Sequence, residues 1–263
     1  MSARVNRIGA WSMRAGLTDH RPWAKVAAGL GLTDVSLSAA EQSRGRFEPF
    51  LSPAKAAAAL RVYADAGIRC HLMLWPVPDL QHVQQSLDYI AAVRAAFPAL
   101  ASVDLDAEEQ WTQHPRRAAL GAAAAGLYRR GWPAGLPLAV NGITAALPRI
   151  ADLVAVADVL WPQAYTTTRP NQTMPPGNRQ HDVYKAWRSA APASATVQMG
   201  LAAYSQDGAG GLPAAEALRR AYDAAAEHVT EIRYWSLQEL SGGTDAAFVR
   251  ARCAELRGAR PSA

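Results

Sequence analysis

The run Val103-Asp104-Leu105-Asp106-Ala107-Glu108 alternates apolar and acidic residues. A β-strand sends successive side chains to opposite faces, so the three acids share one face and the apolar residues share the other. In a barrel whose strands are covered by helices, the apolar face must point outward. The run therefore predicts a barrel strand that carries Asp104, Asp106 and Glu108 as one inward column.

Short β-rich runs lie on both sides of this strand, separated by Ala-rich helical stretches. The strand candidates are Ile8–Met13, Asp34–Ser38, Arg69–Trp75, Ser102–Asp106, Leu138–Asn141, Val159–Tyr165, Thr196–Leu201 and Glu231–Leu237. Strands that alternate with helices predict parallel βαβ units. A (β/α)8 TIM barrel typically takes about 250 residues, so one α/β barrel fits the chain. We expect a single domain over residues 1–256 and a disordered tail over 257–263.

The helical stretches carry their own start and stop signals. Ser52 and Pro53 suit the N-cap and first turn of a helix over Ala54–Ala66, and Gly67 suits its end. The other helices are expected at His82–Phe97, Pro115–Arg130 and Pro213–His228. A dinucleotide-binding sheet would show G-x-G-x-x-G after an early strand, and none is present.

Composition excludes several classes of protein. Half of the 263 residues are hydrophobic and 19% are charged, which is typical of a globular domain. Cys70 and Cys253 suggest neither a disulfide framework nor a zinc site, and no pair of histidines has metal-ligand spacing. We expect no metal and no cofactor. No apolar run is long enough for a membrane span or a secretion signal.

The formal net charge of +5 has two readings. The excess arginines are scattered, which is typical of a solvated surface. A positive surface also attracts polyanions, such as nucleic acid or an anionic cell-wall polymer. With no basic run along the chain, we expect no nucleic-acid partner.

The acidic column indicates proton chemistry. Three carboxylates close together repel one another, which raises the pKa of at least one of them. A carboxylic acid that stays protonated near neutral pH can act as a general acid. The structural alternative is that the acids pair with Arg or Lys and only fill the barrel. Neither a G-x-S-x-G elbow nor a P-loop is present to suggest other chemistry.

Asp104-x-Asp106-x-Glu108 resembles the D-x-D-x-E core of the family 18 chitinases, and it contains the D-x-E of the family 25 lysozymes. The resemblance implies that Glu108 is the proton donor. In the chitinases, it implies that Asp106 orients the N-acetyl group of the substrate, whose carbonyl oxygen is the nucleophile. Tyr165 resembles the inward tyrosine that binds this N-acetyl group, and Trp235 resembles the tryptophan under the sugar at the cleavage point.

Three departures from these families leave the nucleophile open. Ala101 replaces a further Asp of the chitinase pattern, Thr166 replaces the Asp after the strand-six tyrosine, and the first strand lacks the Asp of the lysozyme family. The nucleophile is then the substrate acetamide, Asp106 or water.

Other polar and aromatic residues fall near strand ends, where aromatic faces suit sugar rings. The substrate-binding candidates are Trp11, Trp75, Glu109, Trp111, Asn141, Gln163 and Trp235, and the further candidates are Glu41, Gln198, Tyr204 and Gln238. Glu109 competes with Glu108 for the role of the acid. His71 is expected to be packed and hydrogen-bonded rather than catalytic.

The sequence therefore predicts a monomeric retaining glycosidase that cleaves β-linked N-acetylhexosamine polymers. Peptidoglycan is the preferred substrate and chitin the alternative. We expect synthesis in the cytoplasm without a signal peptide, and action on the cell wall after release or delivery by a phage or an injection system. A non-catalytic carbohydrate-binding barrel is the second hypothesis. A metal-dependent hydrolase with Asp104, Asp106 and Glu108 as oxygen ligands is the third.

Overall fold

The computed structural model describes residues 5–12, 19–43, 46–167, 174–204, 209–241 and 243–258. Its parallel strands are β1 (Arg7–Ser12), β2 (Asp34–Ser43), β4 (Arg69–Leu74), β5 (Val103–Asp106), β6 (Leu138–Gly142), β7 (Val159–Pro162), β8 (Thr196–Val197), β9 (Met199–Ala202) and β10 (Glu231–Trp235). Their order around the sheet is β8-β7-β6-β5-β4-β2-β1-β10-β9. A parallel bridge between Gln163 and Gly200 brings β7 next to β9 and closes the ring. The predicted TIM barrel is confirmed.

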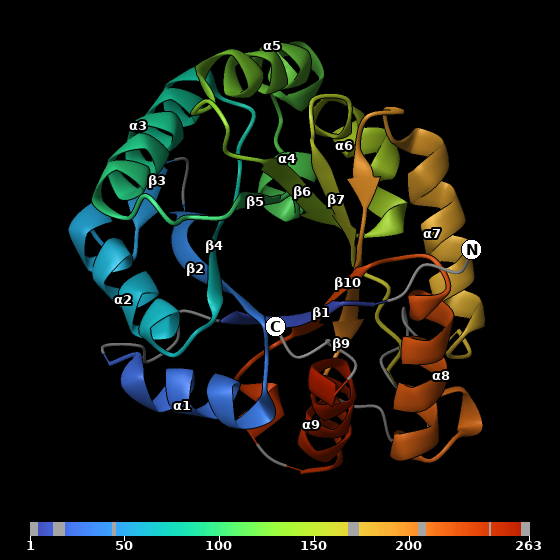
Figure 1. The fold of residues 1–263 in the computed structure, drawn as a ribbon. Helices are drawn as coiled ribbons and strands as arrows, with labels where there is room; N and C mark the ends of the chain where they lie inside the picture. Colours follow the sequence, from blue (N-terminus) through green and yellow to red (C-terminus); the bar gives the residue numbers. More distant parts are fainter. Residues whose placement is uncertain are drawn as a thin grey trace.

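Helices surround the strands in a ring (Figure 1). They are α1 (Arg21–Leu30), α2 (Pro53–Asp65), α3 (Leu80–Ala96), α4 (Glu109–Thr112), α5 (Arg117–Gly131), α6 (Leu147–Val154), α7 (Asn178–Ala190), α8 (Ala214–Ala226) and α9 (Gly243–Gly258), with 3-10 turns at Thr144–Ala146, Ala209–Gly211 and Glu239–Ser241. The Ser52 side chain accepts a hydrogen bond from the Lys55 amide at the start of α2. Gly67 follows that helix with φ of 76°, a conformation that glycine adopts without strain.

Some predicted strand ends differ from the structure, since β2 continues to Ser43, β7 ends at Pro162 and β10 ends at Trp235. Two further features of the sheet were not predicted. β3 (Arg46–Pro49) pairs antiparallel with the end of β2. Its run of four residues is short and ends in Pro49, so the sequence did not indicate a strand there. The seventh strand is divided into β8 and β9 at Gln198. The side-chain oxygen of Gln198 accepts hydrogen bonds from the backbone amides of Thr230 and Glu231.

The predicted end of the domain falls inside a helix. α9 continues to Gly258, two residues past the expected boundary at 256. The rest of the predicted tail, 259–263, lies outside the described residues, as does Met13 at the end of the first predicted strand. Among the described helices, none combines the length and the apolarity that crossing a membrane requires.

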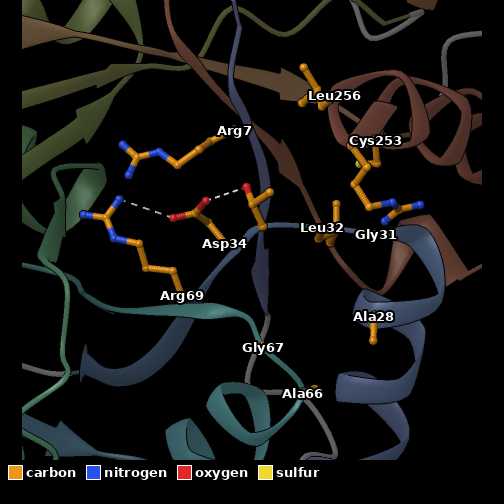
Figure 2. A pocket seen from close by; sticks show the side chains of 12 residues that line it. Arg7, Ala28, Gly31, Leu32, Asp34, Ala66, Gly67, Arg69, Cys253 and Leu256 are labelled. Carbon is orange, nitrogen blue, oxygen red and sulfur yellow. Dashed lines mark hydrogen bonds and ion pairs between the residues drawn. The ribbon is translucent and has the colours of Figure 1, made fainter. Parts of the chain in front are cut away.

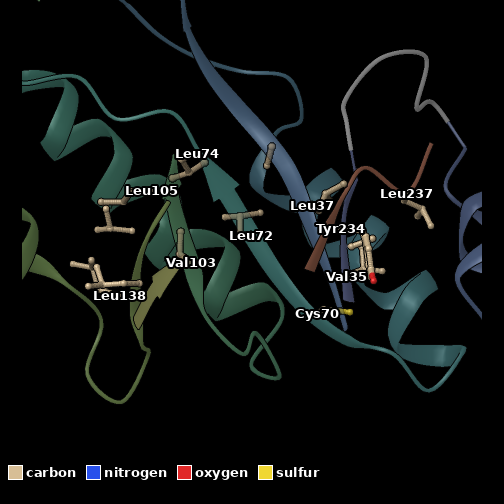
Figure 3. Packing of buried hydrophobic residues seen from close by; sticks show 14 of the residues in the cluster. Val35, Leu37, Cys70, Leu72, Leu74, Val103, Leu105, Leu138, Tyr234 and Leu237 are labelled. Atoms are coloured by element: carbon tan, nitrogen blue, oxygen red, sulfur yellow. The ribbon is translucent and has the colours of Figure 1, made fainter. Parts of the chain in front are cut away.

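The main hydrophobic core lies between the strands and the helices. The outward side chains of Val103 and Leu105 on β5 have no exposed surface, and they pack beside Leu72, Leu74 and Leu138 of the neighbouring strands (Figure 3). Burial of side chains of this size stabilises the fold by about 1.5–3 kcal/mol each. With their apolar neighbours facing outward, the alternate residues of β5 face the barrel interior.

Candidate active site

A buried charge network fills the lower interior of the barrel. Arg233 of β10 donates to Asp104 across 2.6 Å and to Glu231 across 3.0 Å. Ser36 of β2 donates a further hydrogen bond of 2.7 Å to Asp104. All these side chains are buried. The negative charge of Asp104 is therefore compensated by Arg233 within the barrel. For this residue, the alternative that the acids pair with Arg or Lys and fill the barrel is correct.

His71 belongs to the same network. Its Nε2 lies 2.9 Å from Asp34 Oδ1 and its Nδ1 lies 2.7 Å from the Ser102 hydroxyl. Complete burial, together with the charge of Arg233, lowers the pKa of His71 to about 3. The imidazole is neutral near pH 7, so its place in the structure is that of a packed and hydrogen-bonded residue.

A cavity of about 410 Å³ opens below this network, at the N-terminal ends of the strands. Figure 2 shows Arg7, Asp34 and Arg69 among the lining residues, with the Arg69 guanidinium directed at the Asp34 carboxylate. Arg69 lies 3.5 Å from Asp34, and Arg7 pairs with Glu231 at 2.5 Å. The two arginines thus compensate the charge of buried carboxylates. The active sites of TIM barrels lie at the opposite, C-terminal face, so this cavity is not the candidate active site.

A layer of aromatic side chains separates the charge network from the C-terminal mouth. The Trp11 ring meets the Trp161 ring edge-on at 5.8 Å and lies 6.2 Å from Trp235. The Arg233 guanidinium sits 4.1 Å from the centre of the Trp161 ring. Gly200 makes this packing possible, because a Cβ there would lie 2.9 Å from the Trp11 ring.

Above this layer, five side chains at or just after the ends of β5, β6 and β7 form what we call the mouth group: Asp106, Glu108, Asn141, Gln163 and Tyr165. The amide nitrogen of Gln163 donates to Asn141 at 2.9 Å, to Asp106 at 3.2 Å and to Glu108 at 3.4 Å. One buried amide therefore holds both carboxylates at the centre of the mouth.

The two carboxylates of the mouth group differ in environment. Burial raises the pKa of Asp106 well above its ordinary value of 3.8, and the charges of Glu108 and Asp104 raise it further. Hydrogen bonds from Trp75 and Gln163 oppose this rise. Glu108 reaches the surface of the mouth. The protein packed around it also raises its pKa, the Gln163 hydrogen bond opposes the rise, and Glu109 adds to it.

Several buried polar atoms in the upper barrel lack a hydrogen-bond partner among the described residues. They include the hydroxyl of Tyr165, Nδ2 of Asn141 and Nε1 of Trp11. An unmade hydrogen bond on a buried group costs about 1–3 kcal/mol. Burial, followed by the charge of Asp106, raises the pKa of Tyr165 well above its ordinary value, so its hydroxyl remains a proton donor. These atoms can bind the polar groups of a ligand.

A cavity of about 340 Å³ begins at Glu108 and extends beside the mouth group. It is lined by Glu108, Glu109, Thr112, Gln113, Ile143, Ala145, Ala146 and Arg149. Ile143 is 41% exposed, which is unusual for a large apolar side chain, and it offers an apolar wall next to the carboxylate. The cavity has the size of a small-ligand site.

The remaining predicted residues fall in different places. Trp75 and Trp235 are half-buried at the mouth, and Trp11 is buried beneath it. Trp111 lies apart from the mouth group, because its ring is buried under α6 and its N–H donates to the Arg149 carbonyl.

The four further candidates, Glu41, Gln198, Tyr204 and Gln238, do not lie together. Tyr204 packs edge-on against Tyr165 at 6.2 Å. Gln238 donates to Ser12 at 3.4 Å, and Gln198 bonds the backbone at the entrance of β10. The side chain of Glu41 lies outside the described part of the chain.

Arg233 is the important residue that sequence reasoning missed. Glu231-Ile232-Arg233-Tyr234-Trp235 alternates charged and apolar residues as the acidic strand does, apart from the Trp at its end, so the signal was present. The partner of Asp104 lies 129 residues away in the sequence, so the pairing depends on closure of the barrel.

Among the described residues, two sets of side chains could hold a metal ion. They are Asp34, His71 and Glu231 inside the barrel, and His181, Glu227 and His228 outside it. The acidic column of β5 forms neither set, because Asp104 pairs with Arg233. The hypothesis of a three-carboxylate metal site therefore has no geometric support.

No model of a protein family matches the sequence, and no curated protein matches it. A chitinase domain from Pyrococcus furiosus is similar in structure, with a TM-score of 0.66 and 13% identity over 99% of each chain. The spore cortex-lytic enzyme of Bacillus megaterium has a TM-score of 0.66 at 11% identity, covering 95% of this chain and 74% of its own. A xylanase and α-amylase inhibitor protein, solved with trehalose, has a TM-score of 0.65 at 12% identity, covering 93% and 98%. At these identities the likeness shows a common barrel fold.

Proposed function

We propose that this protein is a glycosidase with Glu108 as its general acid. The observation that carries the proposal is the pairing of Glu108 and Asp106 through the Gln163 amide at the C-terminal mouth. Glu108 reaches the surface, and its raised pKa favours the protonated form that a general acid needs. Similarity to a chitinase and to a spore cortex-lytic enzyme supports the same reaction class.

Asp106 and Tyr165 have complementary roles in this proposal. Glu108 protonates the leaving oxygen, while Asp106 orients the N-acetyl group of the substrate by a hydrogen bond. The Tyr165 hydroxyl, which has no partner among the described residues, donates to the acetamide oxygen. Asp104 acts indirectly, because its charge contributes to the raised pKa of Asp106 while Arg233 holds it in place.

The acetamide of the substrate is the nucleophile that we favour. In the described part of the interior, the deeper carboxylates of Asp34, Asp104 and Glu231 are engaged in ion pairs. Apart from the proposed acid Glu108, Asp106 is the inward acid that remains, and burial favours its neutral form. A neutral acid is a poor nucleophile but a good hydrogen-bond donor. The reaction would then retain the configuration at the anomeric carbon.

Peptidoglycan is the substrate that we propose. The net charge of +5 attracts an anionic cell-wall polymer. Arg149 lines the cavity beside Glu108, where it can face acidic groups on the leaving side of the glycan. Chitin is the neutral alternative with the same acetamido groups.

The test is glycan cleavage by the purified full-length protein. Peptidoglycan sacculi, chitin oligosaccharides and β-1,4-mannan, which lacks acetamido groups, are incubated with wild type and with Glu108→Gln. We expect new reducing ends from sacculi with wild type and none from mannan. Cleavage of chitin with intact sacculi would reject peptidoglycan and keep the glycosidase.

A non-catalytic carbohydrate-binding barrel is the second candidate. It is favoured by the similarity to an inhibitor protein that was solved with a sugar. In that case wild type and Glu108→Gln would both retain insoluble glycan in a pull-down assay, and neither would release products.

A further inference from the structure

Two histidines that are far apart in the sequence meet outside the barrel. His181 lies in the first turns of α7, and His228 lies two residues after the end of α8. His181 Nδ1 is 2.8 Å from His228 Nε2. Glu227 offers a carboxylate oxygen, and the three ligand atoms all lie within 4.8 Å of one another.

Neighbouring rings fix the orientation of these imidazoles. Tyr184, one turn after His181 on α7, stacks on His228 with ring centres 4.4 Å apart and an angle of 11°. The two imidazoles are nearly perpendicular, at 88°. Both are half-buried, whereas Glu227 is exposed. The nitrogens therefore point at one place that solvent can reach, and little side-chain freedom remains to be lost when a ligand binds there.

We propose that His181, Glu227 and His228 bind one zinc ion, with water as the fourth ligand. Zinc takes imidazole nitrogen and carboxylate oxygen at about 2.0–2.2 Å in a tetrahedral arrangement. Two nitrogens on such an ion lie about 3.3 Å apart, so the imidazoles need to separate by only about half an ångström. The ion would take the place of the proton that the two imidazoles share.

The buried set of Asp34, His71 and Glu231 is not a comparable site. Cations of the protein already occupy its surroundings, because Arg69 pairs with Asp34 and Arg233 pairs with Glu231. The side chains of Asp34, His71 and Glu231 are also buried, and each takes part in a hydrogen bond or ion pair within the protein. The His181–His228 set is open to solvent, and the nearby cation that acts on it, Lys185, lies on the exposed outer surface of α7 rather than in a buried ion pair.

Zinc at this place would tie α7 to the end of α8. Gln180, next to His181, donates to the Ala164 carbonyl at 2.7 Å and to the Thr166 hydroxyl at 3.1 Å. The same turn of α7 thus contacts the segment that carries Tyr165. A ligand that binds only the folded state stabilises the fold according to its concentration.

Calorimetric titration of the full-length, EDTA-treated protein with zinc chloride tests this site. We expect one zinc per chain and a melting temperature that rises with zinc concentration. His181→Gln and His228→Gln should each weaken zinc binding by about tenfold or more. Glu227→Gln should weaken it less, and His114→Gln, at a half-buried histidine on another part of the surface, should leave it unchanged.

Cobalt provides an independent readout. Visible absorption bands of tetrahedral Co²⁺ should be present in the wild type and in His114→Gln, and absent in His181→Gln and His228→Gln. Circular dichroism verifies that each variant is folded. Equal zinc affinity in wild type and the two histidine variants would overturn the proposal. So would the absence of binding heat and of any melting shift with zinc in excess.

Discussion

Arg233 and Asp104 form an ion pair of 2.6 Å inside the barrel, with side chains 1% and 0% exposed. Because of this pair, the acids of β5 have two roles: Asp104 is structural, and Asp106 and Glu108 are candidates for catalysis. Asp104 is paired with the buried Arg233, whereas Asp106 and Glu108, which lie nearer the C-terminal end of the barrel, belong to the mouth group. Of the three acids that alternate along the strand, only the upper two therefore remain available for proton chemistry.

Asp104→Asn should lower the free energy of unfolding by about 3–5 kcal/mol, because it leaves the buried Arg233 with one carboxylate instead of two. Because Arg233 keeps its ion pair with Glu231, we expect a loss of free energy near the lower end of this range. Urea unfolding measures the effect. The matched control is Asp223→Asn at an exposed pair with Arg219, which should change stability by at most about 1 kcal/mol. Equal losses in the two variants would contradict the structural role of Asp104.

Asp106→Asn should gain stability relative to wild type as pH rises. Between the ordinary pKa of 3.8 and the raised value, folded Asp106 keeps a proton that the unfolded chain has released. The wild type therefore loses stability as pH rises through this window, and the variant does not. Urea unfolding at a series of pH values checks this, with Asp65→Asn at an exposed site as control. A difference between Asp106→Asn and wild type that stays constant with pH, or falls, would refute it.

The sequence predicted most of the fold because the strand pattern is local. Alternation along β5 identified which acids face inward, and the spacing of strands and helices identified a TIM barrel. β3 was missed because Arg46–Pro49 is a short run that ends in proline and forms a strand by pairing with β2. The division of the seventh strand at Gln198 was not predicted, because the hydrogen bonds of its side-chain amide are made with residues 230 and 231, far along the chain.

The candidate site was predicted less completely, since its pairings join distant strands. Gln163 was predicted as a substrate-binding residue, but its link to Asp106 and Glu108 depends on the register of three strands. Trp111 follows the acidic strand closely in sequence, yet the short helix α4 turns its ring into the core. His181 and His228 meet only through the packing of α7 against α8.

Tyr165→Phe should reduce kcat/KM for a chitin oligosaccharide by about tenfold or more, because it removes a hydrogen bond to the bound substrate. Its stability should stay equal or increase, since the hydroxyl has no partner among the described residues. Tyr234→Phe is the matched control. Tyr234 also carries an unpartnered buried hydroxyl, but its ring packs in the outer core (Figure 3). Equal loss of activity in both variants would count against a role for Tyr165 in binding.

Glu109→Gln should shift the alkaline limb of the pH–kcat/KM profile to lower pH. Packing around Glu108 is the main cause of its raised pKa, and the negative charge of Glu109 adds to it. Removing that charge lowers the pKa, so Glu108 loses its proton, and the enzyme its activity, at lower pH. Glu255→Gln on α9 should leave the limb in place. An unchanged or upward shift in Glu109→Gln would show that another group sets the limb.

The central claim, that Glu108 is the general acid, is tested most directly by comparing kcat/KM of Glu108→Gln and Glu109→Gln on the same glycan. The two substitutions are chemically identical, and both residues line the same cavity. We predict that Glu108→Gln loses activity by about 10²–10⁴-fold, the usual contribution of a general acid, while Glu109→Gln keeps most of it near the acidic side of the profile. Equal turnover by wild type and Glu108→Gln, or a greater loss in Glu109→Gln, would contradict the assignment.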